Sequence, residues 1–242
     1  DRDEEVPLPP EPPADEAPRR RGSGGRGDQP SQADQLVELA LDNYTLIRSG
    51  AGSYAVPHVG PNVALTLRGG GNSLRQHLAA AYARRWAKTA TTGALADALN
   101  TLEGYALEDD PTDVELRLAR KVATDGVERL VLDLGDAAGR AVVVGPEGWH
   151  VLDRSPVVFR RTALTLPLPL PVRGGSLEEL REQLNVTDET WPLLVGWLVA
   201  AMLPDLDRPI ALLTGEQGTG KSTAARLLVG LLDPSNAPLR PM

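Results

Sequence analysis

The sequence has no cysteine, a single phenylalanine and only three lysines among its 25 basic residues. The absence of cysteine excludes disulfides, zinc ribbons and thiol catalysis. Long apolar runs are also missing: the longest, Trp191 to Leu203, contains Pro192 and Gly196 and is shorter than the roughly 20 residues that span a bilayer. We expect it to form a buried helix and expect no membrane partner.

The charge balance is negative, with a formal net charge of -8 and a pI near 5.0. A negative surface repels phosphates, so any contact with nucleic acid has to be local. The first residues lack the basic region and apolar run of a secretory signal, and we expect a cytoplasmic protein. At 242 residues and 41% hydrophobic content, the chain can form one large or two modest domains.

Residues 1–33 are rich in proline and acidic residues and carry the basic patch "RRRGSGGRG". Such a segment buries too little apolar surface to offset its chain entropy, so we predict a disordered tail. The patch could contact nucleic acid, although the surrounding acidic residues favour a solvated linker. Its basic residues are Arg19, Arg20, Arg21 and Arg26.

Residues 34–165 read as one α+β accessory domain. A helical apolar face begins at Asp34, the runs "YTLIR", "SYAVP" and "NVALTL" read as strands, and two further helices are predicted over 72–90 and 93–107. Five strand-like runs then follow, separated by turn residues, which predicts an antiparallel meander. These runs cover residues 114–122, 128–135, 141–145, 149–153 and 157–161.

Residues 166–175 are too rich in proline for a central strand and are expected to form a linker between domains. In residues 176–242, Ser176 and Glu179 form a capping box that predicts a short helix, and a second helix is expected to open at Thr187 or Asp188. The run "PIALLTG" is apolar on both faces, which is typical of a central parallel strand.

The stretch "GEQGTGKS", from Gly215 to Ser222, matches the phosphate-binding pattern G-x-x-x-x-G-K-[ST] and stands between this predicted strand and a predicted helix. Glycines let the backbone turn at positive φ and bring its N–H groups close to phosphate oxygens. We expect Lys221 to reach the β- and γ-phosphates of ATP and the hydroxyl of Ser222 to ligate Mg²⁺.

Hydrolysis also requires an acidic residue after a second apolar strand and usually an arginine finger. After Leu232 this sequence holds only "DPSNAPLRPM". A Walker B role for Asp133 or Asp136 is disfavoured, because the next strand-like run makes them part of a hairpin. We therefore expect the loop to be the start of an ATPase domain whose remainder is absent.

Other constellations are weaker. The three histidines, His58, His77 and His150, lack metal-ligand spacing. Asp113 and Glu115 have the spacing by which a primase holds two metals, but a solvent-facing strand edge is favoured. A basic and aromatic group on one predicted helix could contact nucleic acid, although the polar face of a helix also explains it. Its members are Arg84, Arg85, Trp86 and Lys88.

Residues from about 114 to 240 resemble the ATP-binding proteins of phages and integrated elements. The resemblance lies in "DLGDAAGRAVVV", "PVRGG" and "GEQGTGKSTAARLL", among other stretches. Those proteins are similar to the helicase half of phage primase-helicases, in the AAA+ or superfamily 3 group. The resemblance implies that ATP, with Mg²⁺ on Ser222, is bound by Gly215, Gly218, Thr219, Gly220, Lys221, Ser222 and Thr223.

The sequence thus predicts an α/β chain with a disordered tail, an accessory domain and the opening of a P-loop NTPase domain built on a parallel sheet. Our first hypothesis is the N-terminal portion of a helicase-like ATPase that acts in replication of a mobile element. Single-stranded DNA or a primase are the implied partners, and a hexamer is expected only with a complete motor domain. The alternatives are a nucleotide-binding module without catalysis and a P-loop kinase.

Overall fold

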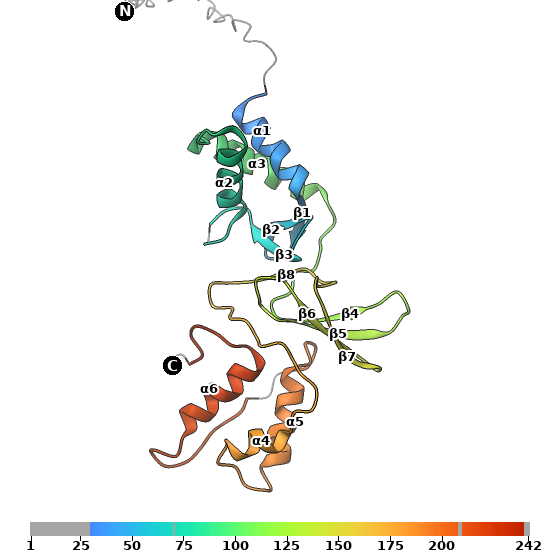
Figure 1. Ribbon diagram of the computed structural model, residues 1–242, viewed down its shortest axis with the longest axis vertical. Helices are drawn as coiled ribbons and strands as arrows, with labels where there is room; N and C mark the ends of the chain where they lie inside the picture. Colours follow the sequence, from blue (N-terminus) through green and yellow to red (C-terminus); the bar gives the residue numbers. More distant parts are fainter. Residues whose placement is uncertain (1–29, 70, 208–209, 240–242) are drawn as a thin grey trace, which may run out of the picture. The chain divides into compact units, whose positions relative to one another are not determined.

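The computed structural model describes residues 30–69, 71–207 and 210–239. Within them the chain forms six helices and two four-stranded sheets (Figure 1). A mixed α/β class was predicted and is confirmed. The predicted disordered tail falls, for residues 1–29, outside the described residues.

The first helices begin where the sequence supplies caps. Helix α1 (Gln32–Asn43) follows Ser31, whose hydroxyl accepts from the Asp34 N–H while the Asp34 carboxylate accepts from the backbone of Ser31. Helix α3 (Thr92–Glu108) follows Thr91, whose hydroxyl accepts from the N–H of Ala94. These side chains satisfy N–H groups that a first helical turn leaves without partners.

The first sheet has the strand order β1-β2-β3-β8, with β1 at Tyr44–Ser49, β2 at Gly52–Pro57, β3 at Val63–Thr66 and β8 at Phe159–Arg160. The first three strands pair antiparallel, but β8 pairs parallel to β3, with Val63 opposite Phe159. The expectation that residues 157–161 would continue the meander is therefore wrong. Phe159 is fully buried, and its burial helps to hold this distant strand in place.

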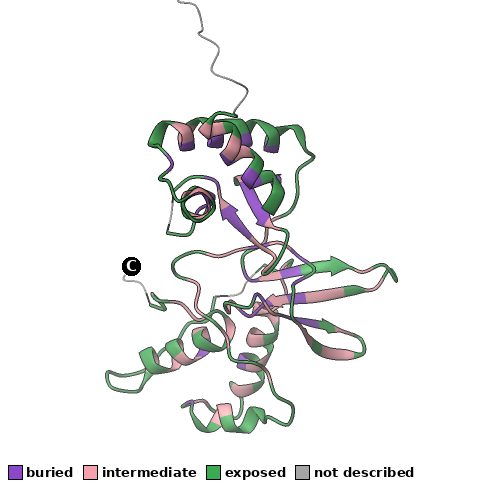
Figure 2. Ribbon diagram, turned by 45° about the horizontal axis from the view of Figure 1, so that its top comes forward, coloured by how far each residue is buried: buried purple, intermediate pink, exposed green. Residues whose placement is uncertain are grey.

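Helices α1, α2 (Leu74–Trp86) and α3 pack around one core with the first sheet. Their buried side chains recur at helical spacing, as Leu74, Leu78 and Tyr82 do on α2. Figure 2 shows buried positions on these helices and on the strands of the first sheet.

The second sheet is the predicted antiparallel meander, in the order β4-β5-β6-β7. Strand β4 spans Leu118–Val122, β5 Glu128–Asp133, β6 Ala141–Gly145 and β7 Gly148–Leu152. The connector over 166–175 contains no helix or strand, as expected from its prolines.

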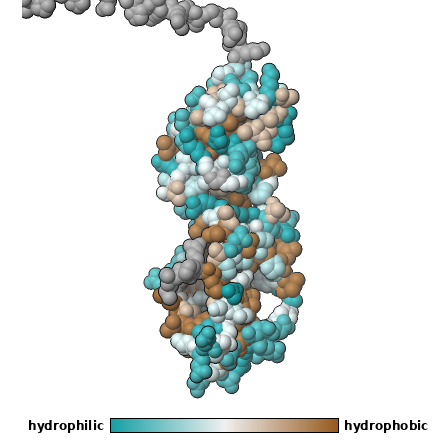
Figure 3. All heavy atoms as spheres, turned by 90° about the vertical axis from the view of Figure 1, so that its left-hand side faces the viewer, coloured by the Kyte–Doolittle hydropathy of each residue, from teal (hydrophilic) through white to brown (hydrophobic). Residues whose placement is uncertain are grey.

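Helices α4 (Leu177–Glu182), α5 (Trp191–Ala201) and α6 (Lys221–Leu232) share a small cluster of Leu184, Leu194 and Leu228. The apolar run that was expected to be a buried helix forms α5, but Leu193 is 73% and Val199 58% exposed. The small cluster covers only one side of this helix. On the face of the molecule seen in Figure 3, hydrophobic side chains, coloured brown, reach the surface. None of the helices in the described ranges has the length and apolarity needed to cross a membrane.

Candidate functional site

Three glycines give the loop before α6 its conformation. Gly215, Gly218 and Gly220 have φ angles of 150°, 87° and 82°, which side chains rarely adopt. At Gly215 a Cβ would also stand 3.0 Å from the Oγ1 of Thr219. The glycines that the motif requires are therefore the residues that this backbone requires.

The ammonium group of Lys221 folds back over the loop. Its Nζ donates to the carbonyl oxygens of Gly215 (2.9 Å) and Glu216 (2.6 Å) and lies 3.4 Å from the Thr219 hydroxyl. That hydroxyl donates to the Glu216 carbonyl at 2.9 Å. The positive charge is thus held within the loop by local contacts and belongs to the first residue of α6.

The start of α6 has backbone donors without acceptors. The N–H groups of Lys221, Ser222 and Thr223 have no acceptor in the part of the chain that the structure describes. Among the described residues no side chain caps this helix at Gly220, and the hydroxyl-bearing Ser222 and Thr223 are exposed. Free N–H groups, the positive end of a helix dipole and an ammonium group fit a phosphate group.

The strand expected before the loop is not formed. Residues 210–215 have no strand pairing, and Ile210 is 95% and Leu212 82% exposed. A parallel strand is stable only with neighbours that take its N–H and C=O groups and cover its faces. Neither sheet of the described residues supplies such a neighbour. The described residues therefore do not form the predicted parallel P-loop sheet.

No group of three or more histidine and acidic side chains that could hold a metal occurs in the described residues. Nδ1 of His58 contacts the carbonyl oxygen of Asp42, and Nδ1 of His77 contacts the hydroxyl of Tyr44. Ser222 as a ligand of Mg²⁺ stays a prediction, since Mg²⁺ in such sites takes most of its oxygen ligands from phosphates and water.

The sequence singled out two acidic pairs, Asp133 with Asp136 and Asp113 with Glu115. Asp133 is the last residue of β5 and Asp136 accepts from the backbone of Gly139 in the following turn, as the hairpin interpretation predicted. Burial, with the nearby charges of Asp113 and Asp205, raises the pKa of Glu115.

The basic and aromatic group lies at the end of α2. Trp86 packs on Tyr82 with ring centroids 4.5 Å apart, and the guanidinium of Arg85 lies 5.0 Å from the Trp86 ring. Arg84, Arg85 and Lys88 are exposed, as expected of the polar face of a helix.

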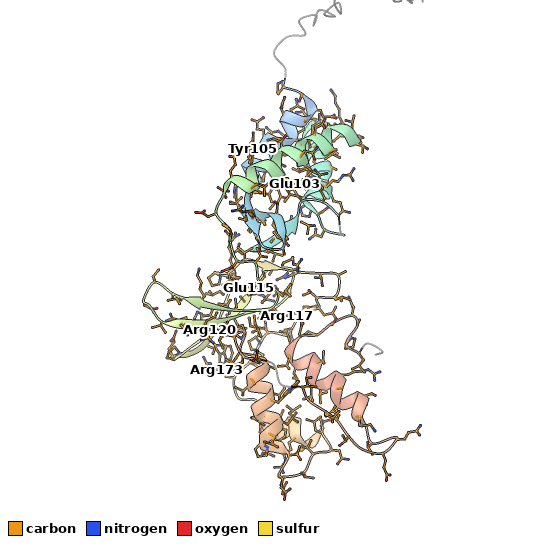
Figure 4. The ribbon with its side chains drawn as sticks, turned by 180° about the vertical axis from the view of Figure 1, so that it is seen from behind. Glu103, Tyr105, Glu115, Arg117, Arg120 and Arg173 are labelled. Carbon is orange, nitrogen blue, oxygen red and sulfur yellow. The ribbon has the colours of Figure 1, made fainter. Side chains whose placement is uncertain are left out.

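Sequence reasoning missed several arginines that connect distant segments. Figure 4 marks Arg117, Arg120 and Arg173, which lie beside or on β4 and in the connector. Arg117 is buried and contacts Asp233, whereas the guanidinium of Arg173 lies over the ring of Trp149 at 4.7 Å. Their partners are far away in the sequence, so no local spacing signalled them.

Residues 178–242 match the model of a family described as actinomycete integrative conjugative element replication protein. The matched segment contains the glycine-rich loop and helices α5 and α6. No curated protein and no solved structure matches the chain. The C-terminal segment is therefore similar to replication proteins of mobile elements.

Proposed function

We propose that this chain is an ATP-binding protein that acts in the replication of a mobile element, with the loop Gly215–Ser222 as its phosphate site. The observation that carries the proposal is that a glycine loop at positive φ, which the Lys221 ammonium contacts, leads directly into a helix whose first N–H groups have no acceptor in the described residues. The family match supports the replication role, because the matched segment includes this loop.

The residues of the loop would have distinct roles. Lys221 would exchange its contacts with the Gly215 and Glu216 carbonyls for the β- and γ-phosphates. Gly218, Thr219 and Gly220 would present backbone N–H groups, and Thr223 would contact the phosphates from the first helical turn. Mg²⁺ on the Ser222 hydroxyl would neutralise phosphate charge.

We further propose that residues 176–242 form the first part of a helicase-like P-loop ATPase domain. The support is the segment Ile210–Leu213, whose apolar side chains are exposed on both alternating sides. Pairing with further parallel strands would cover them. Hydrolysis that is stimulated by single-stranded DNA would then be the activity of the assembled domain.

The test is a titration of the full chain with a fluorescent ATP analogue in the presence of Mg²⁺. Lys221→Ala should abolish saturable binding, because it removes the side chain that balances the phosphate charge. Lys88→Ala is the matched control, since Lys88 is exposed and its loss changes the net charge equally. Ser222→Ala should reduce the gain in affinity that Mg²⁺ produces.

Equal binding of the analogue by wild type and Lys221→Ala, or no saturable binding by wild type, would exclude this site. Loss of binding in the Lys88→Ala control would assign the effect to net charge instead of the loop. Circular dichroism of each variant establishes that the fold is unchanged.

A further inference from the structure

A second site is suggested by a groove of about 860 Å³ on the first sheet. It lies along β3 and the loop that precedes it, beside the start of α2 and the chain that follows β8. Its walls are mainly apolar, and none of the described residues that line it is an aspartate or a glutamate. Its polar lining residues are Tyr44, Thr66, Asn72, His77, Arg160, Arg161 and Thr162.

The walls of this groove are held by contacts between distant segments. Arg154 donates to the Pro57 carbonyl at 3.0 Å and to the Gly60 carbonyl, and Asn62 donates to the Ser155 carbonyl at 3.1 Å. Gly139, at φ 78°, packs so closely that a Cβ there would lie 2.5 Å from the Cβ of Pro61. The groove is thus a defined feature of the packed chain.

A chain of three hydrogen-bonding side chains lies along one side. The Tyr44 hydroxyl is 3.1 Å from Nδ1 of His77, and Nε2 of His77 is 2.6 Å from Oδ1 of Asn72. With the Asn72 oxygen accepting, Nε2 carries the proton and Nδ1 accepts from the Tyr44 hydroxyl. The Tyr44 oxygen and the Asn72 NH₂ group keep capacity for further hydrogen bonds.

Arg160 contributes a positive charge without a carboxylate partner in the described residues. Its side chain is half-buried, and its Nη1 has one long contact, 3.5 Å, to the Tyr54 hydroxyl. The neighbouring Arg161, in contrast, is neutralised by two hydrogen bonds to the Asp133 carboxylate. Arg160 lines the groove from the face of the sheet that carries Tyr54, which is opposite the face of Tyr44. Because none of the described lining residues is acidic, an arginine without an acidic partner favours an anionic ligand here.

We propose that this groove binds a nucleotide unit, with its phosphate on Arg160 and its base against the apolar wall. Planar guanidinium groups bind phosphate oxygens through two parallel hydrogen bonds. The base would pack on the 89% exposed Val59 and on Pro61, with its polar edge toward Tyr44 and Asn72, which offer an acceptor and a donor. The nucleotide could belong to single-stranded DNA or be free, and the two sources share this chemistry.

The experiment uses the full chain carrying Lys221→Ala, so that nucleotide binding at the glycine loop does not contribute. A fluorescein-labelled oligodeoxythymidylate is titrated by anisotropy at several salt concentrations, and dTMP is titrated by calorimetry. Arg160→Gln should weaken binding about tenfold or more and lower the salt dependence by about 0.7 in slope for a single strand. Arg226→Gln, an exposed arginine of α6, is the matched control.

Asn72→Ala provides a second variant at an exposed position, in case Arg160→Gln disturbs the pairing of β3 with β8. It should weaken binding without changing the salt slope. Binding of the oligonucleotide but not dTMP supports the groove as a site for single-stranded DNA, and binding of dTMP alone supports a free nucleotide. Binding that neither variant changes, or no binding of either probe, overturns the proposal.

Discussion

Asp133 shows how a single residue supports the meander. Its side chain is 1% exposed, and its two carboxylate oxygens accept from Nη2 and Nε of Arg161 at 2.6 and 2.8 Å. One of them also accepts from the N–H of Gly135 at 3.1 Å. These donors provide the compensation that a buried charge needs.

We predict that Asp133→Asn lowers the free energy of unfolding by about 3 kcal/mol, because Arg161 keeps a charge that has lost its partner. Urea denaturation of both proteins, followed by circular dichroism, measures the difference. Asp153→Asn is the control, since Asp153 is exposed and has no ion pair in the described residues. A loss of less than 1 kcal/mol would show that water or Asp136 compensates for the missing charge.

At the scale of elements, the β4–β5 hairpin has a titratable turn. The Asp125 carboxylate accepts from Nη1 and Nη2 of Arg129 and from the N–H of Val127. The hydrogen bonds from Arg129, followed by the one from Val127, lower the pKa of Asp125 from 3.8 to about 2. The ionised carboxylate is therefore favoured in the folded chain.

This lowered pKa predicts a pH dependence of stability. A carboxyl whose pKa is lower in the folded than in the unfolded chain binds its proton first in the unfolded chain, so stability falls as pH falls. The contribution of Asp125 should be complete above about pH 4 and be lost as pH falls toward 2.

The measurement is the urea midpoint between pH 5 and pH 2. Asp125→Asn should make its decline with falling pH shallower. Asp97→Asn, at an exposed position of α3, should leave the decline unchanged. An identical decline in wild type and Asp125→Asn would contradict the role of this turn.

At the scale of the whole described chain, Arg117 connects the meander with the segment that follows α6. Its Nε donates to the Asp233 carboxylate at 2.8 Å, its Nη2 to the Leu166 carbonyl at 2.9 Å and its Nη1 to the Asp133 carbonyl at 3.2 Å. The backbones of Leu166 and Pro234 add a hydrogen bond of 3.1 Å. The end of α6 is therefore attached to the connector and to β5.

We predict that Asp233→Ala lowers the free energy of unfolding by about 1–3 kcal/mol, because the buried Arg117 loses its acceptor of opposite charge. Hydrogen exchange should become faster at the amide of Leu166, whose acceptor lies beside Asp233. Asp205→Ala is the contrasting variant: the pair of Asp205 with Arg120 is exposed, so its loss should cost at most about 1 kcal/mol. Unchanged exchange at Leu166 would show that Asp233 does not hold this contact.

The sequence by itself predicted the elements whose causes are local. The glycine loop could be identified because the φ angles of Gly218 and Gly220 depend on the absence of a side chain at those positions. Apolar periodicity predicted the helices, Ser176 predicted the start of α4, and turn residues predicted the antiparallel pairing of β4 to β7. In each case the residues that decide the structure are neighbours in the chain.

Only the tertiary structure decided where distant segments meet. Residues 159 and 160 were expected in the last strand of the meander, but they pair with Val63 and Ala64. This pairing makes Arg160 line the same groove as Tyr44 and His77. The segment over 210–213 had the composition of a buried strand and stays exposed. A strand depends on the N–H and C=O groups of its neighbours, which its own residues do not specify.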